Sequence, residues 1–139
     1  MSELLRLEGI TKSYRMPDGS SLDILSGIDL SLREGEVVSI AGRSGSGKST
    51  LLSIAALLLA PDEGRILYEG RDVSGLSAKE MQSLRSRSVG FVFQSSLLLE
   101  DFTVLENAAM PLLIQGMKPR EAYSEAERLL DKVGLLDRR

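Results

Sequence analysis

A glycine-rich stretch at residues 42–50, Gly-Arg-Ser-Gly-Ser-Gly-Lys-Ser-Thr, constrains the fold of this chain more than any other feature. It matches the pattern G-x-x-x-x-G-K-[ST] of phosphate-binding loops. The four fixed positions are filled by Gly42, Gly47, Lys48 and Ser49. Residues 36–41 before it are a short, β-branched apolar run suited to a buried strand, and residues 48–60 behind it are rich in Leu and Ala and end at Pro61. Strand, glycine loop and helix are the context that the pattern requires, so we predict an α/β fold.

The residue types in this loop are those that a polyphosphate needs. Several backbone N–H groups must point into one concavity, which requires glycines such as Gly42, Gly45 and Gly47 where a side chain would block the anion. The N-terminus of the following helix favours anions as well. Lys48 adds a positive charge for the β- and γ-phosphates, and the Ser49 hydroxyl can ligate Mg²⁺. The alternative is a glycine-rich turn that matches the pattern by chance.

The composition excludes several other kinds of site. The 139 residues are 42% hydrophobic and 27% charged, which fits one globular domain or part of a larger one. The net charge of −3 gives no reason to expect a nucleic-acid surface, and without cysteine or histidine the chain has no disulfide, thiolate zinc site or Ser-His-Asp triad. The longest apolar run, residues 51–60, is shorter than the about 20 residues that span a bilayer. The N-terminus lacks the features of a signal peptide, so we expect a cytoplasmic protein.

The first 35 residues predict an antiparallel sheet beside the phosphate loop. Apolar and polar residues alternate, and Pro-Asp-Gly at residues 17–19 signals a turn. Strands are expected at residues 5–14, 22–25 and 28–32, and a further hairpin edge is expected at residues 65–73. A capping box at residues 77–80 predicts a polar helix that runs to about Arg87.

Residues 89–93, Val-Gly-Phe-Val-Phe, predict a second core strand. It ends in Gln94, at the end of a strand where open α/β sheets place ligand contacts. The organisation that we expect is an antiparallel part at about 1–35 and 65–73, a phosphate-loop core at 36–60 and 89–94, and a helical part at about 95–139.

Two helices are expected in the last third of the chain. A capping box at residues 103–106 opens the first, which carries Pro111 and should be kinked or split by it. The second starts at Lys118-Pro119 and is stopped by Gly134. Its apolar residues at helical spacing are Ala122, Ala126, Leu129, Leu130 and Val133.

The phosphate loop is followed, at the spacing typical of one family, by Phe91-Val92-Phe93-Gln94. On these motifs the chain resembles the ATP-binding subunit of an ATP-binding-cassette (ABC) transporter, and the similarity runs along the whole chain in the family's order. The resemblance implies a P-loop NTPase core of the ABC ATPase type, with an N-terminal antiparallel β subdomain. Segment 97–114, Leu-Leu-Leu-Glu-Asp-Phe-Thr-Val-Leu-Glu-Asn-Ala-Ala-Met-Pro-Leu-Leu-Ile, is similar to the subgroup that powers lipoprotein release from the bacterial inner membrane. The related ATP-binding subunits of macrolide-export and cell-division complexes are also similar in this segment.

Carried over residue by residue, the resemblance implies ATP and Mg²⁺ as cofactors. Tyr14 would stack on adenine, the alternative being a core tyrosine at a strand end. The phosphates would be bound by Ser44, Gly45, Ser46, Gly47, Lys48, Ser49 and Thr50. Gln94 would contact Mg²⁺ and the attacking water. The catalytic candidates are therefore Lys48 and Gln94, and the metal candidates are Ser49 and Gln94. The alternative for Gln94 is an amide that only caps the end of a strand.

The resemblance also implies partners. A second ATP-binding subunit would form a head-to-tail dimer, and residues from about 95 to 105 would face transmembrane permease subunits, which would place the protein on the inner face of the membrane. Four large apolar residues in this short stretch support an interaction surface, whereas a buried core loop is the alternative. These residues are Leu97, Leu98, Leu99 and Phe102.

The sequence departs from the family pattern in what it lacks. It has no Leu-Ser-Gly-Gly-Gln signature, no Walker B strand ending in Asp and Glu, and no switch histidine. Residues 97–101 and 57–63 imitate a Walker B, but the first directly follows a strand and the second ends the phosphate-loop helix, so we reject both. We expect a truncated copy of a longer ATPase, with an exposed apolar edge at residues 36–41.

Two functions from different classes remain open at this point. In the first, the chain is the N-terminal portion of an ATPase subunit that drives a membrane transporter, although alone it would hydrolyse little or no ATP. In the second, it is a non-catalytic module that binds nucleotide. A soluble ABC ATPase would fit the nucleotide site equally well.

Overall fold

The structure, a computed structural model, describes residues 2–95, 97–135 and 137. The chain divides into two compact units, Met1–Arg85 and Ser86–Arg139. Within the described residues, no helix is long and apolar enough to cross a membrane.

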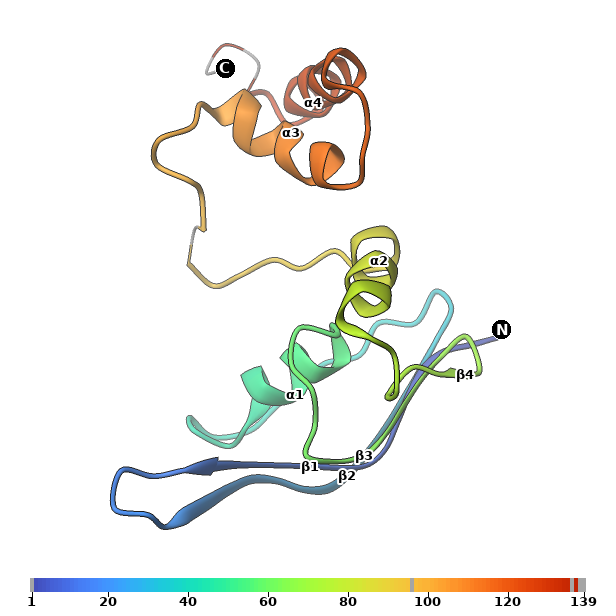
Figure 1. Cartoon of the computed structure of the whole chain (residues 1–139), viewed down its shortest axis with the longest axis vertical. Helices are drawn as coiled ribbons and strands as arrows, with labels where there is room; N and C mark the ends of the chain where they lie inside the picture. Colours follow the sequence, from blue (N-terminus) through green and yellow to red (C-terminus); the bar gives the residue numbers. More distant parts are fainter. Residues whose placement is uncertain (1, 96, 136, 138–139) are drawn as a thin grey trace. The chain divides into compact units, whose positions relative to one another are not determined.

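An antiparallel sheet forms the base of the first unit (Figure 1). Its strands are β1 (Glu3–Arg15), β2 (Ser21–Arg33), β3 (Glu63–Tyr68) and β4 (Arg71–Asp72), in the order β2-β1-β3-β4. The predicted hairpins are confirmed, and the β1–β2 turn is closed by the Met16 N–H, which donates to the Ser20 carbonyl at 2.8 Å. The prediction of two strands at 22–25 and 28–32 is wrong. β2 is continuous because extra residues near Gly27, at φ +66°, are taken up as bulges in its register with β1.

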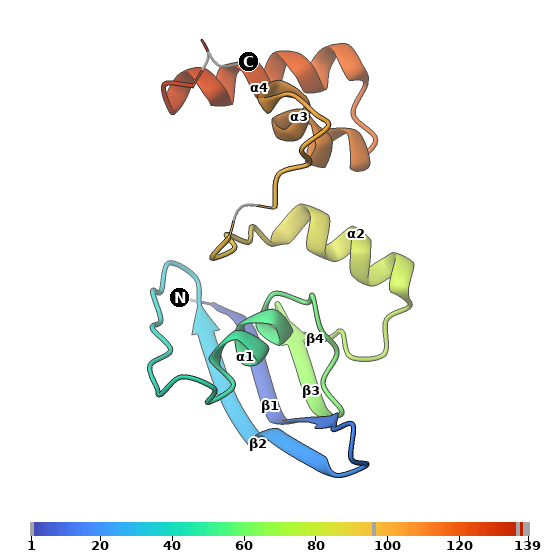
Figure 2. The ribbon, with the colours of Figure 1, turned by 90° about the vertical axis from the view of Figure 1, so that its left-hand side faces the viewer.

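One face of the sheet is covered by α1 (Lys48–Ala55), as Figure 2 shows. The buried residues of α1 are Leu51 and Ile54, and those of the sheet are Leu5, Leu7, Ile10, Leu25 and Ile66. A short helix of this length is marginal alone, so the burial of its apolar side against the sheet holds it in place. The helix that carries the phosphate loop is therefore positioned by the antiparallel strands.

The end of α1 differs from the prediction that the helix runs to residue 60. The chain leaves the helix at Leu57, whose φ of +59° is left-handed, and the N–H of Leu58 donates to the Ser53 carbonyl at 2.8 Å. The N–H of Leu57 donates to the Ile54 carbonyl, which completes a Schellman motif with leucine where glycine is usual. The guanidinium of Arg85, on α2 (Ala78–Ser88), donates to the Leu57 carbonyl at 2.8 Å and so caps this turn.

The capping box that predicts α2 is confirmed. The Glu80 carboxylate accepts from the N–H of Ser77 at 3.0 Å, and the N–H of Glu80 points back to the Ser77 hydroxyl at 3.4 Å. The Ser77 hydroxyl, which also donates to the Glu80 carboxylate at 2.6 Å, and then the Ser77 N–H lower the pKa of Glu80.

The two predicted core strands at residues 36–41 and 89–93 are absent from the described structure. Val37 is 96% exposed and Val92 is 94% exposed, so neither segment is buried. Runs of this kind suit strands that are covered on both faces and paired on both sides. No strand among the described residues pairs with them, and an unpaired strand leaves its N–H and C=O groups without ladder hydrogen bonds.

The second unit is a helical hairpin of α3 (Val104–Ile114) and α4 (Pro119–Lys132). The helices meet through three fully buried alanines, Ala109, Ala122 and Ala126. Side chains packed around them are Leu105, Ala108, Leu112, Leu113, Met117 and Tyr123. The predicted stop at Gly134 is confirmed, with φ +71° and the N–H of Leu135 donating to the Leu130 carbonyl.

Two details of this unit differ from the sequence prediction. The helix α3 continues through Pro111, so the predicted split is wrong; a single proline removes only one helical N–H bond. Leu129 is 43% exposed and Val133 is 66% exposed, although both were expected on the apolar face. Helical spacing predicts a face, and of the residues expected on that face of α4 only Ala122, Ala126 and Leu130 are buried.

Candidate nucleotide-binding site

The glycine loop lies above the sheet and leads into α1 (Figure 1). Gly47 is the N-cap of α1 and has φ +84°, and a Cβ atom there would lie 2.8 Å from Ile24 Cγ2 and 3.0 Å from the Ile24 carbonyl. A Cβ on Gly42 would likewise lie 2.8 Å from the Ser46 hydroxyl. Gly47 therefore requires glycine, because of its left-handed φ and the nearby Ile24 carbonyl of β2, whereas at Gly42 the Ser46 side chain would have to move.

Lys48 closes the loop. Its Nζ donates to the carbonyls of Gly42, at 3.0 Å, and of Arg43, at 2.6 Å. An ammonium has three N–H donors, so two hold the loop and one remains for a further acceptor. Lys48 thus places a positive charge over a loop whose shape it helps to fix.

The donor set around the loop fits an anion. A cavity of about 260 Å³ is lined by Ile24 and by residues 45–50. The first turn of α1 carries no acidic residue, and no side chain caps its N–H groups from the Gly47 position. Free N–H groups at a helix N-terminus, together with an ammonium, suit phosphate oxygens. The Ser49 hydroxyl, in the same lining, is a suitable ligand for Mg²⁺.

Tyr14 lies at the hairpin end of β1, in the same unit as the loop. It pairs with Leu22 of β2, two residues before Ile24, which contacts Gly47. Its side chain is 43% exposed, so the alternative that it is a buried core tyrosine is wrong. Its proposed stacking on adenine stays a prediction.

Gln94 belongs to the second unit, whereas the phosphate loop belongs to the first. It is exposed and lies in irregular chain. The alternative that it caps a strand is wrong, because no strand forms before it. The structure does not bring Gln94 and Lys48 together within one unit, and the role of Gln94 in catalysis stays a prediction.

The stretch expected to face a membrane partner is exposed. Leu97, Leu98, Leu99 and Phe102 are 64%, 63%, 47% and 44% exposed, so the alternative of a buried core loop is wrong. Residue 96 lies outside the described residues.

The side chain of Asn107 holds this loop through hydrogen bonds to its backbone. Its side-chain carbonyl accepts from the Leu99 N–H at 2.8 Å, and its amide donates to the carbonyls of Leu99, Phe102 and Thr103 at 3.0–3.1 Å.

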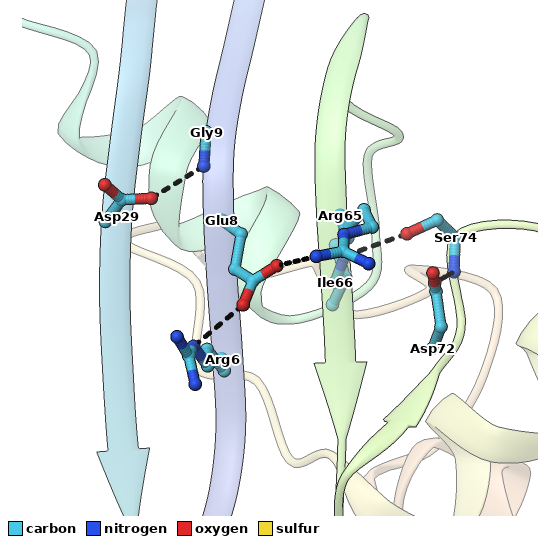
Figure 3. A network of polar contacts seen from close by, with 8 residues as sticks. All are labelled: Arg6, Glu8, Gly9, Asp29, Arg65, Ile66, Asp72 and Ser74. Carbon is cyan, nitrogen blue, oxygen red and sulfur yellow. Dashed lines mark hydrogen bonds and ion pairs between the residues drawn. The ribbon is translucent and has the colours of Figure 1, made fainter.

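A polar network on the sheet face opposite α1 holds the strands that carry the site (Figure 3). The Glu8 carboxylate lies 3.0 Å from Arg6 Nε and 2.6 Å from an Arg65 nitrogen, which links β1 to β3. The N–H of Gly9 donates to the Asp29 carboxylate at 2.7 Å, which fixes a bulge between β1 and β2. These exposed contacts specify the register more than they add stability.

Sequence reasoning missed two residues near the site. Lys12 and Asp62 form an ion pair with Nζ and Oδ1 2.6 Å apart, on the same unit as Tyr14 and the loop. The spacing of Lys12 two residues before Tyr14 on one strand places both on one face and was a usable signal. Nothing in the sequence marks Asp62 as its partner, since the two are 50 positions apart.

A glycine loop closed by a lysine at the start of a helix is the arrangement of a phosphate-binding loop. The family model described as "ABC transporter" matches residues 25–139, and the chain belongs to that family.

Relatives support this assignment. The chain is 47% identical over 135 residues to the lipoprotein-releasing system ATP-binding protein LolD of Bacteroides fragilis, covering 97% of this chain and 60% of that protein. It is 47% identical over 138 residues to the LolD of Aquifex aeolicus, covering 99% of this chain and 59% of that protein. The chain thus spans about 60% of the length of the curated relatives that it matches.

A solved structure shows the fold directly. A dimeric, post-hydrolysis state of the ATP-binding cassette MJ0796 bound to ADP and Pi superposes with a TM-score of 0.83 at 35% identity, over 92% of this chain and 56% of that one. The chain therefore has the ATP-binding-cassette fold of P-loop NTPases, with its N-terminal antiparallel sheet.

Proposed function

We propose that this chain binds ATP with Mg²⁺ through residues 42–50, as part of the ATP-binding subunit of an ABC transporter that drives lipoprotein release. The observation that carries the proposal is the loop itself, in which Lys48 and the uncapped N-terminus of α1 surround a cavity without an acidic residue. Family membership supports ATP as the ligand, and the relatives named for lipoprotein release support the transport process.

In this proposal the residues have distinct tasks. The phosphates contact the backbone N–H groups of Gly42 and Ser44 to Thr50, and Lys48 directs its remaining donor to them. Ser49 holds Mg²⁺, which when bound neutralises charge on the phosphates. Tyr14 offers a ring to the base. The anchoring of Gly47 against Ile24 keeps the loop in one shape, so that binding does not require the loop to be ordered first.

Hydrolysis and transport belong to the proposal for the whole protein. Gln94 positions the attacking water there, but it lies outside the unit that holds the loop. Phosphoryl transfer depends on placing water and metal, so we expect the 139-residue chain to bind ATP with little turnover. The partners are a second ATP-binding subunit, arranged head to tail, and membrane permease subunits contacted through residues 95–105.

A non-catalytic nucleotide-binding module is the second candidate. It is favoured by the fact that loop, α1 and supporting sheet all lie in one unit. A soluble ABC ATPase is a third, but the exposed leucines at 97–99 favour a protein partner at a membrane.

Calorimetric titration of the purified chain with ATP in excess Mg²⁺ tests the proposal. Lys48→Ala should weaken binding by about tenfold or more, because it removes the full positive charge whose remaining donor is proposed to reach the phosphates. Lys79→Ala, at an exposed position on α2, is the matched control and should leave the affinity unchanged. A folded wild-type chain that binds no ATP, or equal binding by both variants, contradicts the proposal. Phosphate release in the same samples separates the ATPase from the binding module.

A further inference from the structure

Two polar residues follow the apolar row on the inner face of β1. Leu5, Leu7 and Ile10 are buried beneath α1, with one extra residue absorbed at the bulge of Gly9. Lys12 and Tyr14 continue the same row towards the hairpin. Lys12 pairs across the sheet with Leu25, whose side chain approaches Gly47, so this part of the face is the one beneath the phosphate loop.

Lys12 is held in one place by Asp62. Its side chain is only 15% exposed, and its Nζ lies 2.6 Å from Asp62 Oδ1. Asp62 is itself fixed to β1, because its Oδ2 accepts from the N–H of Ser13 at 2.7 Å and its own N–H donates to the Thr11 carbonyl at 2.9 Å. The Lys12 contact, followed by the Ser13 N–H, lowers the pKa of Asp62, so the carboxylate is charged at neutral pH.

The ammonium of Lys12 lies over the ring of Tyr14, 5.9 Å from its centroid. A cation over an aromatic face is attracted by the ring's quadrupole. An aromatic ring has two faces, and Lys12 covers one of them. The Tyr14 side chain remains 43% exposed, which leaves ring surface for a flat ligand.

We propose that Lys12 and Asp62 are positioning residues for the base of the bound nucleotide. Asp62 holds Lys12 against one face of Tyr14, so that the ring is fixed and presents its other face to a purine whose phosphates lie on the loop. This rests on the proposed nucleotide site. The advantage is one of preorganisation, since neither the lysine nor the tyrosine has to be ordered when the base arrives.

Two probes separate base recognition from phosphate binding. ATP and inorganic tripolyphosphate, each with Mg²⁺, are titrated calorimetrically into the intact chain, and the ratio of their affinities is compared between variants. Lys12→Met and Asp62→Asn should each weaken ATP binding by about two- to fivefold and leave tripolyphosphate binding unchanged, because the cation over the ring is lost or released. Tyr14→Ala should lower the same ratio at least as much.

A double variant shows whether Lys12 acts through Tyr14. In the Tyr14→Ala background, Lys12→Met should cause no further loss of ATP affinity. Lys12→Arg retains a cation and should bind ATP as the wild type does, which guards against variants that fail to fold. Lys79→Met is the control for loss of a lysine.

The outcomes distinguish the two proposals. Binding of neither probe by the folded wild type overturns the nucleotide site and this inference with it. If ATP binds and Tyr14→Ala lowers the ratio, but Lys12→Met and Asp62→Asn do not, the site stands and the positioning role is wrong. Equal loss of both probes in Lys12→Met assigns Lys12 to the phosphates and also overturns the inference.

Discussion

The sequence predicts strands in the antiparallel sheet and at residues 36–41 and 89–93, and only the sheet forms. Each strand of the sheet finds its neighbour within residues 3–72, with β1 between β2 and β3. The two segments find none among the described residues, and Val37 and Val92 are almost fully exposed. The comparison shows that an apolar β-branched run becomes a strand only where a hydrogen-bonding neighbour is available.

The phosphate loop connects an unpaired segment to an element that is packed on the sheet. On one side it continues from the unpaired segment 36–41, and on the other it enters α1, which rests on the sheet. Its shape is therefore fixed from the helix side, where Gly47 packs against Ile24 and Lys48 closes back on Gly42. The antiparallel sheet and α1 thus hold the shape of the loop without a strand before it.

The largest expected effect compares two valines, one buried directly after β4 of the sheet and one in the unpaired segment 36–41. Val73 is 1% exposed and its N–H donates to the Ile66 carbonyl at 2.9 Å. Val73→Ala should lower the free energy of unfolding by about 1.5–3 kcal/mol, because two buried carbons are removed and a cavity is left. Urea denaturation followed by circular dichroism measures it.

Val37→Ala makes the same chemical change at a position that is 96% exposed. The free energy of unfolding should stay within about 0.5 kcal/mol of the wild type. A loss at Val37 as large as that at Val73 would mean that residues 36–41 are packed in solution, and the contrast between the two regions would be wrong.

An intermediate effect is expected at Asn107, which orders an exposed loop without any strand. Its side chain makes four hydrogen bonds to the backbone between Leu99 and Thr103. Asn107→Ala should cost about 1–2 kcal/mol of stability in the second unit, since these bonds go partly to water instead. Amide exchange at Leu99 and Phe102 should rise together with the loss. Unchanged exchange at both would show that the loop is ordered by other contacts.

The smallest expected effect is the pH dependence of a helix cap. The N–H of Thr103, and then its hydroxyl, lower the pKa of Glu106 below its ordinary 4.5. A carboxyl whose pKa is lower in the folded state contributes stability above the unfolded pKa and loses it as the pH falls through the folded pKa. Urea midpoints of wild type and Glu106→Gln should differ slightly at neutral pH, and the difference should shrink as the pH falls below 4.5 and vanish once the pH is below the folded pKa. A difference that persists in acid contradicts this assignment.

Local patterns in the sequence predicted local structure well. The capping boxes at Ser77 and Thr103, the turn at residues 17–19 and the helix stop at Gly134 all depend on contacts within a few residues. The end of α1 could not be predicted, because leucine rarely adopts the left-handed φ seen at Leu57 and its cap, Arg85, is distant in sequence.

The parts of the site that are formed by residues close together in the sequence could be predicted, and the parts formed by distant residues could not. The loop at 42–50 carries its own pattern, and residues 45–50 of it line one cavity together with Ile24. The pairing of Lys12 with Asp62 crosses from β1 to the chain before β3, and only the register of the sheet brings the two together. Gln94 was expected at the end of a strand, and without that strand its neighbours were not predictable from sequence.

Hydrogen exchange of the intact chain, with and without Mg-ATP, tests the central claim most directly. The claim is that the antiparallel sheet holds a phosphate loop competent for ATP while residues 36–41 and 89–94 remain unpaired. We predict slow exchange in β1, β2 and β3, fast exchange in both unpaired segments, and new protection at residues 42–50 when Mg-ATP is added. Protection of residues 36–41 equal to that of β1 without nucleotide, or no change at residues 42–50 on adding Mg-ATP, would contradict it.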